Sequence, residues 1–123
     1  FRTSIENLLD CFGIYSAIRD EAGQILDFRI DYLNRVALES NDLTANVIGQ
    51  SLTERFPRYR NSSVFAEHCR LVETGQPRIK ESYLYSEVFG DPLRPVICDV
   101  RSSKLGDGFV SAWRDVTEQR RLE

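Results

Sequence analysis

The chain has 123 residues, of which 28% are charged and 41% hydrophobic, and its formal net charge is −3. This length supports one domain with one core, and the composition is typical of a folded domain rather than a disordered one. The basic residues form no stripe, so a nucleic-acid surface is not expected. No apolar run approaches the roughly 20 residues of a membrane span, and no signal peptide is visible, so a cytoplasmic location is expected.

The three cysteines, Cys11, Cys69 and Cys98, are odd in number and match no zinc spacing. Each lies in a segment of apolar periodicity. This pattern favours buried free thiols in a reducing compartment over a disulfide or a metal site.

The first third of the chain predicts a helix followed by a β-hairpin. Thr3 and Glu6 have capping-box spacing ahead of an apolar stripe, so residues 1–12 are expected to form an amphipathic helix. Strands are expected over residues 13–19 and 26–32, joined by a turn at Gly23. Apolar side chains alternate with polar ones in the second strand and are predicted to share one face: Leu26, Phe28, Ile30 and Tyr32.

Several short helices and one longer helix are expected next. Asn34 can cap a helix over residues 35–40, and Ser51 with Glu54 forms a capping box that starts another short helix. The longer helix is predicted to start at Ser62 or Ser63 and to end at Gly75, before Pro77. Its buried face consists of Val64, Phe65, His68, Leu71 and Val72.

Three more strands are predicted, over residues 79–87, 96–103 and 109–114, with a tight turn at Gly106 to Gly108. Asp115 can then act as the N-cap of a final helix, with Glu118 at the capping-box position. Because this exit helix runs to the end of the sequence, the chain is expected to be part of a longer protein. The order of elements predicts an α+β fold, with helices on one face of an antiparallel sheet and room for a hydrophobic cavity between them.

Three motifs, in order along the chain, resemble those of PAS domains of the bacterial sensory-box type. Residues 113–123 are similar to the family's Asp-x-Thr motif, which is followed by Glu and a basic pair. Asn34 and Ala37 match a "tyrosine-x-Asn-x-x-Ala" helix entry, and residues 48–52 match an "Ile-Gly-x-x-Leu" step. The resemblance covers essentially the whole chain. It implies a PAS fold with a five-stranded antiparallel sheet of order 2-1-5-4-3, helices on one face and a small-molecule pocket.

The same resemblance divides the chain into an N-terminal cap helix (1–12), a PAS core (13–116) and the start of a signalling helix (117–123). It implies signal transduction: a ligand or partner binds, and the change passes to an effector such as a histidine kinase of a two-component system, a cyclic-dinucleotide enzyme or a transcription regulator. It also implies a homodimer through the first helix and the opposite sheet face. The relay residues are Trp113, Asp115 and Thr117, although the last two are equally compatible with a plain helix cap.

The candidate pocket residues are Tyr15, Tyr32, Asn34, Leu52, Phe56, Phe65, His68, Val72 and Tyr83. Five aromatic residues are predicted to lie in strands: Tyr15, Tyr32, Tyr83, Tyr85 and Trp113. Some of them could pack only in the core, and others could present a polar tip to a ligand, and strand alternation does not decide between the two. The alternative to a ligand sensor is a ligand-free dimerisation module whose cavity is filled by side chains.

The cofactor remains unidentified from the sequence. Haem-binding relatives take their axial histidine from the long helix, but His68 lies too close to Gly75 to match that position, so haem is not expected. The stretch from Asn41 to Gln50 carries no cysteine, so covalent flavin photochemistry is not expected. An enzyme would need His68 to meet Asp99 or Glu87, and no nucleophile, phosphate-binding or metal motif is present in the sequence, so binding is expected rather than catalysis.

Overall fold

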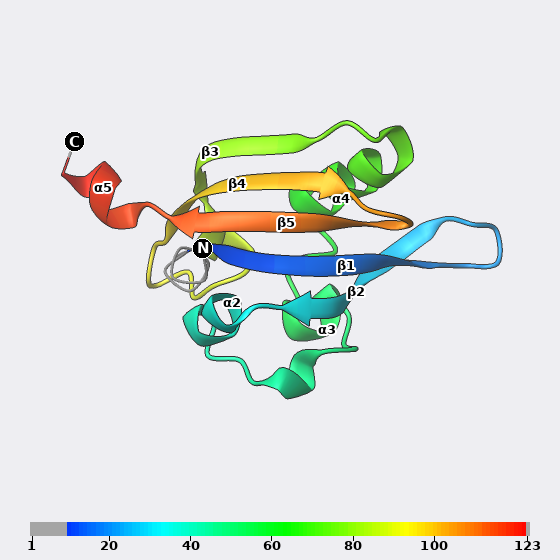
Figure 1. Cartoon of the computed structure of the whole chain (residues 1–123), viewed down its shortest axis with the longest axis horizontal. Coiled ribbons are helices and arrows are strands. Elements are labelled where there is room, and N and C mark those ends of the chain that lie inside the picture. Colours follow the sequence, from blue (N-terminus) through cyan, green and yellow to red (C-terminus); the bar gives the residue numbers. More distant parts are fainter. Residues whose placement is uncertain (1–9, 123) are drawn as a thin grey trace, which may run out of the picture.

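The computed structural model describes residues 10–122, which form a five-stranded antiparallel sheet with helices packed against it (Figure 1). The strand order is β2-β1-β5-β4-β3, so the α+β class and the predicted strand order are confirmed. The strands are β1 (Cys11–Arg19), β2 (Ile25–Leu33), β3 (Arg78–Leu84), β4 (Ile97–Lys104) and β5 (Gly108–Asp115).

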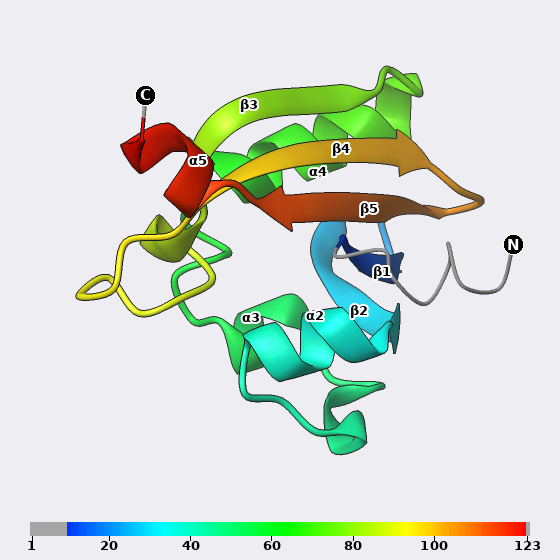
Figure 2. The ribbon, with the colours of Figure 1, turned by 60° about the vertical axis from the view of Figure 1, so that its left-hand side comes forward.

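The helices divide between the two halves of the sheet. α4 (Ser63–Thr74) packs against β3, β4 and β5, whereas α2 (Arg35–Ser40) contacts β1 and α3 (Leu52–Arg55) contacts β2 (Figure 2). The last helix, α5 (Thr117–Arg121), lies beside β4. Among the described residues, none of the helices is long and apolar enough to cross a membrane.

The predicted caps set the helix boundaries. The side chain of Asn34 accepts a hydrogen bond from the N–H of Ala37, which starts α2. Ser51 and Glu54 form the reciprocal capping box of α3, as their spacing predicted. Ser62 caps α4, and Gly75 ends it in the left-handed conformation with φ of 78°.

A bulge in β2 changes which side chains face the core. Ile14 pairs with Tyr32 and Tyr15 pairs with Ile30, so Asp31 has no partner in β1. The extra residue reverses the alternation, because each single-residue step turns a side chain to the other face. Tyr32 is therefore 47% exposed and packs edge-on against Phe12, with ring centroids 6.1 Å apart. The prediction that it shares the buried face of β2 is wrong.

Two predicted boundaries also change. β1 begins at Cys11, so Cys11 and Phe12 are strand residues rather than the end of the predicted helix over residues 1–12. Residues 1–9 of that predicted helix lie outside the described residues. β3 ends at Leu84, and Tyr85–Glu87 form a 3₁₀ turn where the prediction continued the strand. The backbone N–H of Tyr85 donates to the Val96 carbonyl oxygen at 2.9 Å and starts this turn.

The cysteines are free thiols, as predicted. Cys11 and Cys98 are buried, and Cys69 is half-buried. Burial raises the pKa of each of the three thiols above its ordinary value. These thiols therefore stay protonated near neutral pH and pack as small apolar side chains.

Candidate functional site

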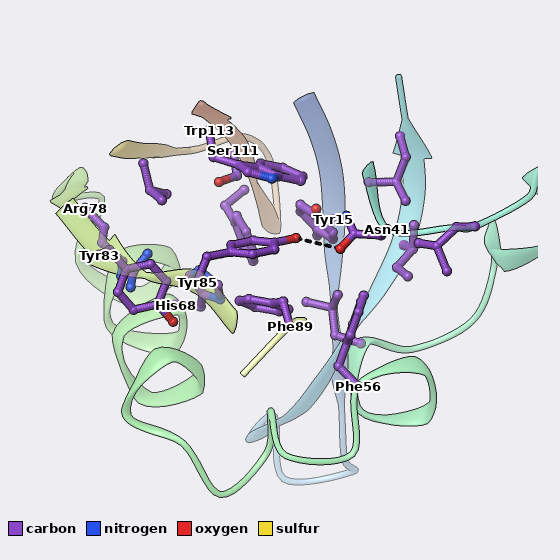
Figure 3. A pocket seen from close by; sticks show the side chains of 16 residues that line it. Tyr15, Asn41, Phe56, His68, Arg78, Tyr83, Tyr85, Phe89, Ser111 and Trp113 are labelled. Carbon is purple, nitrogen blue, oxygen red and sulfur yellow. Dashed lines mark hydrogen bonds between the residues drawn. The ribbon is translucent and has the colours of Figure 1, made fainter. Parts of the chain in front are cut away.

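A cavity of about 40 Å³ lies between the sheet and the helices (Figure 3). At ~10–15 Å³ for each water molecule, it holds about three of them. Most of its lining is apolar or aromatic. The lining residues are Tyr15, Ile30, Leu33, Asn41, Leu43, Leu52, Phe56, His68, Arg78, Tyr83, Tyr85, Phe89, Val100, Phe109, Ser111 and Trp113.

The structure brings together some of the residues that the sequence suggested for a pocket. The expected relay residue Trp113 lines the cavity. Five of the candidate pocket residues also line it: Tyr15, Leu52, Phe56, His68 and Tyr83. The five candidates come from β1, the α3 region, α4 and β3, and Trp113 comes from β5; these segments are distant from one another in the sequence.

Four other candidates lie elsewhere. Tyr32 is on the outer face because of the bulge at Asp31. The Asn34 side chain is used by the backbone: it accepts from the N–H groups of Ala37 and Phe12 and donates to the Asp10 carbonyl oxygen. Phe65 packs against the rings of Phe28 and Tyr59, and Val72 is part of the core.

Sequence reasoning missed Arg78 and Phe89, both of which line the cavity. Arg78 follows Pro77 at the start of a strand rich in charged residues, so it resembles a surface residue, yet its exposed fraction is 8%. Phe89 lies just before Gly90 in a segment with no periodicity. The one available signal is the i, i+4 spacing of Tyr85 and Phe89, which places two aromatic rings next to each other when the chain turns.

The Tyr85 side chain extends across the cavity. Its ring stacks on Phe89 and Trp113, with centroids 5.2 Å and 6.0 Å away, and its hydroxyl group donates to Asn41 Oδ1 at 3.3 Å (Figure 3). A surface groove of about 510 Å³ lies on the other side of this ring. The cavity and the groove share five lining residues: Asn41, Phe56, Tyr85, Phe89 and Trp113. Tyr85 therefore occupies space that would otherwise join the two.

A network of hydrogen bonds holds the Tyr85 turn in place. The Val96 N–H donates to Ser86 Oγ at 3.0 Å, in addition to the bond between Tyr85 and Val96. The Arg58 guanidinium donates to the carbonyl oxygens of Glu87 at 2.8 Å and Gly90 at 2.6 Å. Arg58 thus connects the segment before α4 to the segment after β3.

The polar end of the cavity is formed by α4 and β3. Arg78 Nε donates to Glu67 Oε1 at 2.6 Å, and its guanidinium carbon lies 5.3 Å from the centroid of the Tyr83 ring. The Tyr83 hydroxyl group is buried and makes no hydrogen bond of ordinary geometry within the described part of the chain. Burial raises the pKa of Tyr83 to about 12, and the charge of Arg78 opposes part of this shift.

His68 lies at the same end of the cavity and is 4% exposed. Its Nδ1 is 2.7 Å from the Tyr59 hydroxyl group, and its ring stacks on Phe109 with centroids 4.1 Å apart. Loss of solvation holds the pKa of His68 well below the ordinary value of 6.5, and the positive charge of Arg78 lowers it further. The imidazole is therefore neutral at physiological pH.

The arrangement around His68 matches neither a haem site nor a pairing of His68 with Asp99 or Glu87. With the side chains as they stand, the cavity is far too small for a porphyrin, and Nδ1 already has a partner. Asp99 does not line the cavity: its carboxylate accepts from the Ser82 N–H at 2.9 Å and pairs with Arg120. Glu87 is exposed. His68 therefore meets neither carboxylate.

We expect acid to destabilise the protein through His68. The native imidazole resists protonation, whereas the unfolded one protonates below about pH 6.5, so stability is full above that pH and falls as pH decreases through it. The free energy of unfolding should therefore be about 1.4 kcal/mol lower at about pH 5.5 than at about pH 7.5 because of this one group. Urea denaturation at both pH values should show a smaller pH dependence in His68→Asn than in the wild type. The same pH dependence in the two proteins would contradict the assignment.

The junction between β5 and α5 is bonded to the start of β4. The Val116 N–H donates to the Ile97 carbonyl oxygen, and the Ile97 N–H donates to Thr117 Oγ1, both at 2.8 Å. Asp115 Oδ1 accepts from the Thr117 N–H at 2.9 Å. Ile97 follows Val96, which binds the Tyr85 turn. Val96, which precedes β4, is thus bonded to the turn at the cavity wall, and Ile97, the first residue of β4, is bonded to the start of the exit helix.

The cap of α5 differs in detail from the prediction. The helix begins at Thr117, and Val116 occupies the N-cap position without a side-chain bond. Asp115 does bind the first helical N–H, but Glu118 pairs with Arg121 at 3.5 Å instead of completing a capping box. The predicted capping box of α5 is therefore wrong, since the helix starts one residue later than a cap at Asp115 requires.

A second contact attaches α5 to the sheet. Arg120 Nε donates to Ser82 Oγ at 2.8 Å, and Arg120 Nη2 lies 3.4 Å from Asp99 Oδ2. Ser82 is a non-glycine residue with a positive φ of 53°, at an irregularity of β3 between Lys80 and Tyr83. The exit helix is thus bonded to the strand segment that leads directly to Tyr83.

Replacing Thr117 with valine should release α5 from the sheet. Valine keeps the branched shape but removes the oxygen that accepts from Ile97 N–H, and an unsatisfied N–H costs about 1–3 kcal/mol. We expect the amides of α5 to lose hydrogen-exchange protection while the core strands keep theirs. Thr117→Ser, which retains the hydroxyl group, is the matched control. Unchanged protection of α5 in Thr117→Val would show that this bond does not hold the helix.

No family model matches the chain. A search of the curated proteins also finds no significant match. The geometry of the cavity and of the exit junction is therefore the basis for a functional assignment.

Proposed function

We propose that the chain is a PAS-type sensor or relay domain of a larger signalling protein. The observation that carries this proposal is the pair Val96 and Ile97, which is bonded to the cavity wall through Tyr85 and Ser86 and to the exit helix through Val116 and Thr117. The sheet order and the three PAS-like motifs support the same assignment.

The proposed mechanism is a shift in packing rather than a chemical reaction. A ligand that enters the cavity changes the positions of Tyr85 and Trp113, both of which line it. One route then leads along β5 from Trp113 to Asp115, and the other leads from the Tyr85 turn through Ile97 to Thr117. The two routes meet at the first turn of α5. Bonds of about 1 kcal/mol suit an element that must shift between two states only a few kcal/mol apart.

The wider assignments belong to the same proposal. The domain acts in the cytoplasm, forms a homodimer through its N-terminal helix and outer sheet face, and controls an effector module in the same chain. A histidine kinase, a cyclic-dinucleotide enzyme and a transcription regulator are the candidate effectors.

The test is the double substitution Asp115→Ala and Thr117→Ala in the longer protein. We expect the output to stop responding to its signal, because both side-chain contacts of the α5 start are removed. Circular dichroism and the melting temperature of the isolated domain check that the core still folds. A folded double variant with an unchanged response would overturn the relay role.

A second candidate function is a ligand-free dimerisation module. The small volume of the cavity favours it, since the stacked rings of Tyr85, Phe89 and Trp113 occupy one side of the cavity. Native mass spectrometry, an absorption spectrum and sedimentation of the purified domain distinguish the two functions. A co-purifying small molecule supports the sensor, whereas an empty protein that dimerises with increasing concentration supports the module.

A further inference from the structure

The cavity has one end that offers hydrogen-bond donors and a body that is apolar. We propose that it binds a small monocarboxylate, with the carboxylate group at Arg78 and Tyr83 and the alkyl group toward the aromatic rings. This inference rests on the proposed function, because it names the class of ligand that the sensor cavity accepts.

The cation at this end is Arg78, whose side chain is 7% exposed. Its Nε lies 2.6 Å from one oxygen of Glu67, whereas Lys80, whose Nζ is 3.7 Å from the other oxygen, is more exposed and does not line the cavity. Glu67 bonds to Arg78 through Nε, and the guanidinium also interacts with the Tyr83 hydroxyl oxygen, so its two terminal nitrogens make no hydrogen bond to a carboxylate among the described residues. A buried guanidinium presents these nitrogens in a planar fork that matches a carboxylate.

A neutral donor lies at the same end. The buried Tyr83 hydroxyl group lacks a hydrogen-bond acceptor in the described part of the chain. A carboxylate, which only accepts hydrogen bonds, satisfies both this hydroxyl group and the guanidinium of Arg78.

The size of the cavity limits the rest of the ligand. Its volume of about 40 Å³ leaves room for a carboxylate with a very short alkyl group, because Tyr85 closes the far side. Acetate fits this description and has a matched neutral analogue, acetamide, of the same shape.

The experiment is a titration of the ¹⁵N-labelled domain with sodium acetate, at constant ionic strength set by sodium chloride, followed by amide chemical shifts. We expect saturable shifts in β3 and α4, with a dissociation constant at least about tenfold lower than that of acetamide. Arg78→Gln should lose at least about tenfold in affinity, whereas Lys80→Gln, which removes the exposed cation beside the same Glu67, should bind acetate within about threefold of the wild type.

Tyr83→Phe keeps the test decisive if Arg78→Gln does not fold. It removes only the hydroxyl group, which donates to no acceptor in the described part of the chain, and should weaken acetate binding about tenfold without weakening acetamide binding to the same extent. Equal affinities for acetate and acetamide, or undiminished acetate binding in Tyr83→Phe and in any folded Arg78→Gln, would overturn the proposal.

Xenon separates this inference from the proposed function, because it occupies small apolar cavities without using any donor. Saturable xenon shifts without a preference for acetate would leave a ligand cavity in place and overturn only the carboxylate. The absence of saturable shifts with both probes would overturn the small-ligand sensor together with the carboxylate.

Discussion

Replacing Gly108 with alanine is expected to lower the free energy of unfolding by about 3 kcal/mol or more. A Cβ atom at this position would lie 1.9 Å from the Tyr15 carbonyl oxygen and 2.9 Å from Ser16 Cα. Both neighbours are backbone atoms of β1, so they cannot rotate away as a flexible side chain would. The strands β1 and β5 would have to separate where Ser16 pairs with Gly108.

Gly106→Ala is the matched control in the same hairpin. Gly106 has a positive φ of 56°, but a Cβ atom there would have no neighbour within 4 Å. Its substitution should therefore cost only the strain of a left-handed residue, about 1 kcal/mol. Urea denaturation of the two variants measures the difference. Similar losses in both would mean that the contact with Tyr15 relaxes easily.

The second large effect is expected for Tyr85→Ala, which should join the cavity to the surface groove. The variant loses a ring that stacks on Phe89 and Trp113, together with the hydrogen bond to Asn41. We expect a loss of about 2–4 kcal/mol in unfolding free energy, in the range of other large-to-small substitutions. The vacated space should bind benzene, which the wild-type cavity is too small to hold. Thermal shift and amide chemical shifts in the presence of benzene measure this gain.

Tyr32→Ala is the control for the same change of residue at an exposed place. Tyr32 is on the outer face and lines neither the cavity nor the groove. It should cost at most about 1 kcal/mol and should not create benzene binding. If Tyr85→Ala binds no benzene while it remains folded, neighbouring side chains have closed the space and Tyr85 is not a removable wall.

Local signals in the sequence predicted the elements well where a single side chain decides a backbone boundary. Ser51 with Glu54, Ser62 and Gly75 each satisfy or terminate a helix end through their own atoms, so their spacing is sufficient. The strand order came from the resemblance to PAS domains, and the structure has the same order.

The residues whose positions were not predicted correctly are placed by contacts with partners that are distant in the sequence. The bulge at Asp31 arises from the pairing of β2 with β1, and alternation within β2 alone does not reveal it. The burial of Arg78 depends on Glu67 in α4 and on Tyr83, and its own segment is rich in exposed charges. Tyr85 lines the cavity from the 3₁₀ turn that follows β3, and this turn is bonded to Val96 and Arg58, both of which are distant from it in the sequence.

The hydrogen bonds of Val96 with Tyr85 and of Ile97 with Thr117 couple the two ends of the proposed relay. The Val96 carbonyl group, which accepts from Tyr85, and the Ile97 N–H, which donates to Thr117, belong to the same amide group. That group is planar and rigid, so a tilt that lengthens one bond reorients the other. Each bond also polarises the amide and strengthens its neighbour. The turn that carries Tyr85 and the first residue of α5 are therefore joined by a single resonant unit, and weakening either bond weakens both.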